Sequence, residues 1–310
     1  MLVRLTRMMS MASTQLLPLT KARLVSKRLS NQEFTQQIGN RVVTGGFLPN
    51  EVEFFSSMLA GGRIDRETLI WSFFRLPDRM IPERVRLNII AAHHDARVEL
   101  VTKVLPAAKR IIDLGGASDL AVQGALLSMG YPHRPDSLSI VDRPPERRTD
   151  YNPQIEQRNT LEHNGTRINY VDADLSDLSS FADRSIDMVW SGQSIEHVST
   201  EIGKKTIASC HRVLAKDGRL CLDTPNGRVA RLASPHALLH PEHQIEYVPS
   251  HLISLIENEG FRVVKALAIS PLPISARIGR LSRAEMIENR GLGADPTNGF
   301  SFYLEAVKAE

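Results

Sequence analysis

Apolar and polar positions along the chain follow two different periods. From residue 110 onward, short apolar runs alternate with longer segments in which apolar residues recur every three or four positions. The short runs predict strands and the longer segments predict helices. The predicted strands span 110–115, 138–142, 168–173, 186–191 and 219–224, and the predicted helices span 118–129, 201–214 and 249–259. Strands that alternate with helices are typical of a parallel, doubly wound α/β sheet.

The last part of the chain departs from this alternation. Two strand-like segments, 261–269 and 300–308, need no helix between them, so we expect them to pair as an antiparallel end of the sheet. The residues between them, 270–299, are rich in proline and glycine. We expect this stretch to form an excursion or a lid.

The chain before residue 110 has a helical pattern throughout. Apolar residues at helical spacing predict helices near 51–60 and 82–105, with Asp65 as the cap of another helix between them. We therefore divide the chain into a basic arm over 1–32, a helical N-terminal region or cap over 33–109, and a sheet domain over 110–310.

The charge distribution sets the arm apart from the rest of the chain. The chain carries 38 basic and 35 acidic residues, and six of the basic ones but no acidic one lie in residues 1–32. The remaining 32 basic residues give the rest of the chain a net charge of about −3. A mildly acidic body argues against nucleic acid as a partner. The arm itself is compatible with a disordered segment, a mitochondrial presequence or peripheral contact with an anionic membrane.

The remaining bulk features indicate an ordinary globular protein. No run of about 18 apolar residues occurs, so we expect no membrane span. The two cysteines, Cys210 and Cys221, fall in a predicted helix and a predicted strand, which favours buried thiols in a reducing compartment. We expect a cytoplasmic location, with a mitochondrial one as the alternative if residues 1–30 are a presequence.

Acidic residues and glycines mark the ends of the predicted strands. In chain order, these ends read Asp-Leu-Gly-Gly-Ala at 113–117, Ile-Val-Asp at 140–142, Val-Asp-Ala-Asp-Leu at 171–175 and Ile-Glu-His-Val at 195–198. Open α/β sheets bind nucleosides at this edge, and an acid after the second strand can accept both ribose hydroxyls. A carboxylate two residues before the first glycine suits a ligand that carries an amine and a positive charge.

With these motifs in this order, residues 110–310 resemble the class I S-adenosylmethionine-dependent methyltransferases. The resemblance is closest to the small-molecule group with an Asp-x-Gly first motif and an Ile-Glu-His-Val fourth motif. It implies a doubly wound, seven-stranded, mostly parallel sheet of order 3-2-1-4-5-7-6, with strand seven antiparallel. It also implies S-adenosylmethionine as the cofactor.

The resemblance further implies that residues at the strand ends bind this cofactor. Asp113 would hold its methionine part, Asp142 its ribose hydroxyls, and Asp174, rather than Asp172, its adenine amine. Asp119 stands where the family usually has a glycine, and we expect it to cap the following helix. The full implied set is Asp113, Gly115, Gly116, Ala117, Asp142, Asp174, Ser191 and Gln193.

The chemistry of methyl transfer points to a second set of residues. A sulfonium methyl is already activated, so the protein mainly aligns the acceptor and excludes water. A hydroxyl acceptor also needs a base, and His197, His240 and His243 are the candidates. His197 can instead be a structural hydrogen-bonding residue, and residues 240–243 can be a polar loop. We assign no metal, because the spacing of these histidines matches no standard ligand set.

The expected function is S-adenosylmethionine-dependent methyl transfer to a small-molecule or glycan-linked acceptor, most simply a hydroxyl. The glycan acceptor rests on two loose resemblances. Residues 240–247 resemble methyltransferases often found among carbohydrate and cell-surface glycan genes, and residues 54–78 resemble a helical module of bacterial surface-polysaccharide proteins. Two alternatives stay open: a quinone or lipid-precursor methyltransferase, and a non-catalytic methyltransferase-like subunit that binds a partner through 33–109. A dinucleotide oxidoreductase is disfavoured, because no Gly-x-Gly-x-x-Gly pattern follows the first strand.

Overall fold

The computed structural model describes residues 28–73, 83–118, 121–144 and 160–309. Most of the basic arm and Asp119 lie outside the described residues. The chain divides into two compact units, Met1–Phe74 and Arg75–Glu310. Among the described residues, we find no helix with the length and apolar character needed to cross a membrane.

The first unit consists of helices whose ends follow local sequence signals. Its described helices are α2 (Asn31–Val42), α3 (Pro49–Ala60) and α4 (Arg66–Ser72). As predicted, Asp65 caps α4, since its carboxylate accepts a hydrogen bond from the Thr68 amide at 2.7 Å. The rings of Phe47, Phe55 and Phe73 lie 5.2–5.6 Å apart and form the centre of this unit's core.

The second unit is built on one nine-stranded sheet of order β3-β4-β2-β1-β5-β6-β9-β7-β8. The strands from β4 to β6 along this order are parallel, and β9 is antiparallel to both β6 and β7. The antiparallel pairing of the last two long strands was predicted and is confirmed. The strands are β1 (Arg110–Leu114), β2 (Ser137–Asp142), β3 (Leu161–His163), β4 (Thr166–Asp172), β5 (Ile186–Gly192), β6 (Leu214–Pro225), β7 (Phe261–Pro271), β8 (Leu292–Gly293) and β9 (Gly299–Lys308).

The prediction of seven strands in the order 3-2-1-4-5-7-6 is therefore wrong for the whole sheet. It missed β3, which pairs antiparallel with β4, and β8, which pairs antiparallel with β7. These strands have three and two residues, too few for an alternation of apolar and polar positions to be visible. Without them, the order across the sheet is β4-β2-β1-β5-β6-β9-β7.

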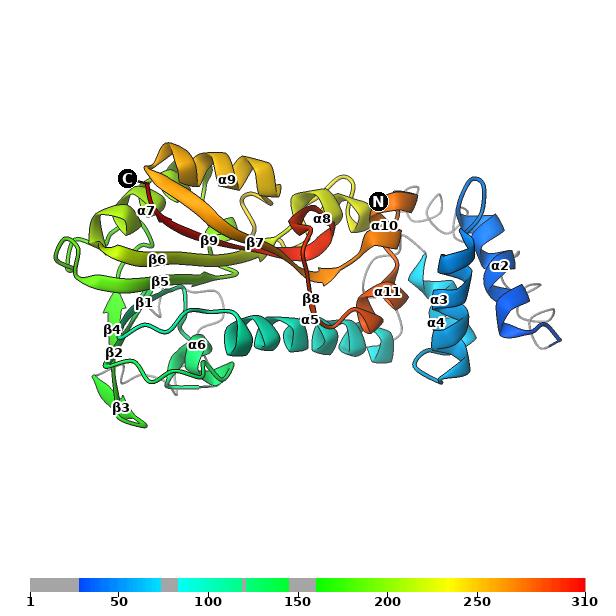
Figure 1. The fold of residues 1–310 in the computed structure, drawn as a ribbon, viewed down its shortest axis with the longest axis horizontal. Coiled ribbons are helices and arrows are strands. Elements are labelled where there is room, and N and C mark those ends of the chain that lie inside the picture. The colour runs from blue at the N-terminus through cyan, green and yellow to red at the C-terminus, as the bar shows by residue number, and fades with distance from the viewer. Residues whose placement is uncertain (1–27, 74–82, 119–120, 145–159, 310) are drawn as a thin grey trace, which may run out of the picture. The chain divides into compact units, whose positions relative to one another are not determined.

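Helices cover both faces of the sheet, as the doubly wound class requires (Figure 1). On one face, Ile207 of α7 and Leu252 of α9 share a buried cluster with the strands; on the other, Leu100 of α5 and Leu126 of α6 do so. Cys210 and Cys221 are both buried, as predicted. The helices of this unit are α5 (Glu83–Lys103), α6 (Gly124–Ser128), α7 (Thr200–Val213), α8 (Gly227–Ala233), α9 (Pro249–Asn258), α10 (Pro273–Ile278) and α11 (Arg283–Glu288), with 3₁₀ turns η4 (Ile195–His197) and η5 (Pro296–Asn298).

Two predicted helical regions differ from the structure. In the described part of the helix predicted over 118–129, the helical segment is the short α6, which begins at Gly124, where a φ of 80° breaks the helical conformation. The last helix of the region 33–109, α5, lies in the second unit, where Ala96 and Leu100 bury its apolar face against the sheet. The predicted excursion over 270–299 contains α10, α11, β8 and η5.

Candidate active site

The carboxylate of Asp113 is the central charged group at the carboxyl end of β1. Its neighbours in the sheet are Ile140 of β2 and Trp190 of β5, and only 1% of the residue is exposed. Oδ2 has no hydrogen-bond partner among the described residues. Burial raises the pKa of Asp113 to about 7. A buried carboxylate with an unused oxygen would gain from a ligand that brings a positive charge.

The turn after Asp113 needs its glycines. Gly115 has a φ of 70°, and a Cβ atom on it would overlap the side chain of Ser194. A Cβ atom on Gly116 would overlap the carboxylate of Asp113. Glycine is therefore needed at both positions, because neighbouring side chains lie too close to the backbone to leave room for a Cβ atom. Next in the chain, the Ala117 amide donates to Asp142 Oδ2 at 3.2 Å, so the turn joins the ends of β1 and β2.

The other predicted cofactor residues differ in burial and in their position along the edge of the sheet. Asp142 stands in register with Asp172 at the ends of β2 and β4. Asp174 is exposed beyond the end of β4. Ser191 is buried at the end of β5, opposite Leu114 in β1.

Gln193 is oriented toward a buried ion pair that the sequence analysis missed. Its Nε2 donates to Asp223 Oδ2 at 2.6 Å, and its φ of 58° is left-handed. Asp223, at the end of β6, also accepts two hydrogen bonds from the guanidinium of Arg97, at 2.9 and 3.2 Å. Burial alone would lower the pKa of Arg97, but the nearby carboxylates, first of all Asp223, raise it. Arg97 comes from α5, on the helical face that also carries Ala96 and Leu100.

His93, one turn before Arg97 on α5, lies between two serine hydroxyls. Its Nδ1 is 3.3 Å from Ser270 Oγ and its Nε2 is 3.3 Å from Ser301 Oγ. Burial, followed by the positive charges of Arg97 and His94, lowers the pKa of His93 to about 3. His93 is therefore neutral in the folded protein near pH 7.

This lowered pKa predicts a loss of stability in acid. Between pH 6.5 and 3 the unfolded chain binds a proton at His93 before the folded chain does, so the free energy of unfolding falls as the pH falls. The contribution is at most about 1.4 kcal/mol per pH unit. Urea unfolding of the wild-type protein and His93→Gln from pH 7 to pH 4 measures it. We expect the stability advantage of the wild-type protein over the variant to shrink below pH 6.5, and an advantage that is independent of pH would contradict this.

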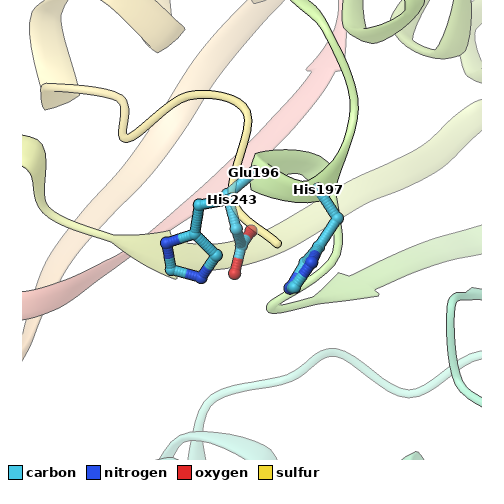
Figure 2. A group of neighbouring side chains, drawn as sticks. All are labelled: Glu196, His197 and His243. Atoms are coloured by element: carbon cyan, nitrogen blue, oxygen red, sulfur yellow. The ribbon is translucent and has the colours of Figure 1, made fainter. Parts of the chain in front are cut away.

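Three histidines and a glutamate gather just after β5. Glu196, in the turn η4, is fully buried; Thr224 Oγ1 donates to its Oε2 at 2.8 Å, and its Oε1 has no partner among the described residues. The ring centroids of His197 and His243 are 5.0 Å apart, and His240 lies 5.5–6.1 Å from both. Figure 2 shows Glu196, His197 and His243 directed toward a common space. The structure thus brings the three predicted base candidates together.

Backbone contacts hold this cluster in place. The amides of Gln244 and Ile245 donate to the carbonyl of Glu196 at 2.8 and 3.2 Å, which joins the loop before α9 to η4. The side chain of Gln244 donates to the carbonyl of His197 at 3.0 Å. Burial raises the pKa of Glu196 to about 7 and lowers the pKa of His197. The backbone contacts therefore keep the cluster compact.

Comparison with known proteins places this geometry in a family. The model of a family described as a methyltransferase domain matches residues 146–222, which include β4, β5, η4 and α7. The chain therefore contains a methyltransferase domain. The recognition of a methyltransferase from the strand-end motifs is confirmed. No curated protein matches the chain.

Solved structures share the Rossmann-like fold of this methyltransferase at low sequence identity. The methyltransferase structure in complex with the Haloferax volcanii Trm112 activator has a TM-score of 0.50 and 15% identity, over 73% of this chain and 94% of that one. A methyltransferase from Thermotoga maritima has a TM-score of 0.47 and 14% identity, over 73% and 95%. A Burkholderia thailandensis 1,6-didemethyltoxoflavin-N1-methyltransferase with bound S-adenosylhomocysteine has a TM-score of 0.41 and 15% identity, over 85% and 92%.

Proposed function

We propose that this methyltransferase transfers the methyl group of S-adenosylmethionine to a hydroxyl of a small-molecule or glycan-linked acceptor. The observation that carries the proposal is the cluster of Glu196, His197 and His243, the first two of which lie in η4, just after β5 at the carboxyl edge of the sheet. A hydroxyl must lose its proton to become a good nucleophile, and a cluster of titratable groups at this edge supplies that chemistry. An amine acceptor would have less need of it.

The turn after β1 is suited to the methionine part of the cofactor. The unpartnered Oδ2 of Asp113 would accept from the ammonium group, and the bare backbone of Gly115 and Gly116 allows close approach. Asp142 accepts from the amides of Ala117 and Arg143 at the end of β2, and we place the ribose hydroxyls beside it. When bound, the cofactor supplies the activated methyl group. We place Asp174 at the adenine amine and Ser191 and Gln193 beside the methionine.

His243 is the best-oriented of the three base candidates. Its Nδ1 lies 2.9 Å from Oε1 of Glu246, a buried carboxylate. This contact uses Nδ1, so Nε2 is the nitrogen left to take a proton, and the carboxylate would stabilise the protonated ring, as it does for other histidine bases. His240 is exposed.

Replacement of His243 by alanine is expected to slow methyl transfer at least about 100-fold, which is the usual contribution of a general base. Binding of S-adenosylhomocysteine should not change, because His243 lies outside the proposed cofactor residues. Transfer of labelled methyl groups to hydroxyl-bearing candidate acceptors measures the first effect, and isothermal titration measures the second. His236→Ala, an exposed histidine in the same loop, is the matched control. Unchanged rates in both His197→Ala and His243→Ala would remove these histidines from the reaction.

A further inference from the structure

Two imidazoles and one carboxylate converge after β5 with the spacing of metal ligands. Glu196 and His197 belong to η4, and His243 comes from the loop before α9 (Figure 2). One ligand atom of each residue lies within 4.8 Å of the ligand atoms of the other two. Two histidines and one glutamate are a recurring ligand set of catalytic zinc sites, where a fourth position stays open for water or substrate.

The buried carboxylate of Glu196 supplies an independent indication. It has no exposed surface, and its Oε2 accepts a hydrogen bond from the hydroxyl of Thr224. Oε1 has no hydrogen-bond partner in the part of the chain that the structure describes. Buried charges in proteins are normally paired or coordinate a metal. A cation between the two imidazoles would satisfy Oε1.

The groups behind these three residues are arranged as in known metal sites. Glu246 Oε1 lies 2.9 Å from His243 Nδ1 and also accepts the Leu239 amide at 2.5 Å, so the ring is fixed and Nε2 is left for an ion. Metal-bound histidines usually have such a carboxylate on the second ring nitrogen. The amides of Gln244 and Ile245 tie the two segments together at the Glu196 carbonyl. The donors are therefore held in place by contacts outside the donor set.

We propose that Glu196, His197 and His243 bind a divalent transition-metal ion of the zinc class. Nitrogen and carboxylate donors suit this class, whereas Mg²⁺ and Ca²⁺ prefer all-oxygen sites. His240 is exposed and stands outside the group of three, so it is not one of the ligands. The spacing of histidines within the loop 240–243 gave no sign of this site, because two of the three ligands lie in η4.

The ion would activate the acceptor hydroxyl for methyl transfer. This part of the inference rests on the proposed function. The open coordination position takes the hydroxyl oxygen of the acceptor, and the positive charge lowers the pKa of that hydroxyl. The hydroxyl proton leaves to water, the oxygen forms a bond to the methyl carbon, and the sulfur keeps the electron pair of the broken carbon–sulfur bond. His197 and His243 then act as ligands, and the ion replaces a free imidazole as the activating group.

Zinc binding by the untagged, full-length protein is the direct test. After removal of metals by dialysis against a chelator, we expect isothermal titration with zinc chloride to show one site per chain. Co²⁺ in its place should give the visible absorption of a four- or five-coordinate ion. Glu196→Gln, which keeps the volume of the side chain, and His243→Ala should each weaken zinc binding at least about 100-fold, and Glu246→Gln about 10- to 100-fold. His236→Ala should bind as the wild-type protein does.

The outcomes separate the metal site from the proposed function. Absence of zinc binding, or equal binding by the wild-type protein and Glu196→Gln with a wild-type circular dichroism spectrum, overturns the site. If zinc binds but no hydroxyl acceptor is methylated, the site stands and the hydroxyl acceptor is wrong. If the metal-free protein methylates a hydroxyl at the same rate as the zinc-loaded protein, the proposed function stands and the catalytic use of the ion fails.

Discussion

Replacement of Asp113 by asparagine should weaken the binding of S-adenosylhomocysteine about 100-fold at pH 8. Asparagine keeps the size of the side chain but removes its negative charge, and Oδ2 is the atom left unused by the protein. A hydrogen bond to a charged group contributes about 1.5–3 kcal/mol, and each 1.4 kcal/mol is a factor of ten in affinity. Isothermal titration measures the change.

The same residue should make cofactor affinity depend on pH. Burial raises the pKa of Asp113 to about 7, so below pH 7 an ammonium-bearing ligand must displace a proton from it. The affinity of the wild-type protein should therefore rise between pH 6 and pH 8, by up to about tenfold per pH unit at the acidic end. Asp113→Asn should show no such dependence.

A matched control distinguishes this effect from general damage. Asp187→Asn removes a carboxylate near the other end of the same strand pair, where it binds the exposed Arg110, and should leave cofactor affinity unchanged. Titration in buffers of different ionisation enthalpy should show proton release on binding for the wild-type protein at pH 6. Wild-type affinity in Asp113→Asn at pH 8 would rule out Asp113 as the partner of the methionine ammonium.

The long strands could be predicted because each is a buried apolar run that ends in a polar residue. Ile111 and Ile112 run into Asp113, and the pattern alone identifies both the strand and its end. The short β3 and β8 carry no such signal, because their pairing depends on the neighbouring strands β4 and β7. The helix after the first motif was overestimated for a local reason, since the left-handed conformation of Gly124 cannot be inferred from its identity alone.

Of the candidate site, too, some residues could be predicted from the sequence and others could not. Asp113 and Asp142 could be found because both stand at strand ends, which share one edge of a parallel sheet. Arg97 could not, because its partner Asp223 is 126 residues away and the pairing depends on how α5 packs on the sheet. Glu196 was visible as part of a motif, but its burial and its unused oxygen come from the contacts of η4 with β6 and with the loop before α9.

Replacement of Arg97 by methionine should lower the free energy of unfolding by about 3–5 kcal/mol, the usual cost of leaving a buried charge without its partner. Asp223 is fully buried, and in the variant its carboxylate would keep the hydrogen bond from Gln193 but lose both hydrogen bonds from the guanidinium. The loss should be large because Arg97 also lowers the energy of the Asp113 and Glu196 carboxylates. Urea unfolding at pH 7.5 measures it.

Two further variants show whether the charge or the volume of Arg97 is responsible for the loss of stability. Lys103→Met removes a cation from the same helix, but its partner Glu99 lies at the surface, so the change should cost less than about 1 kcal/mol. Combining Arg97→Met with Asp223→Asn removes both charges, and the double variant should be destabilised by less than the sum of the two single changes. If Arg97→Met proves as stable as Lys103→Met, the carboxylates at the carboxyl edge of the sheet do not depend on Arg97. With the expected loss, the α5 guanidinium is the counter-charge that allows the carboxylates of Asp113, Glu196 and Asp223 to lie near one another.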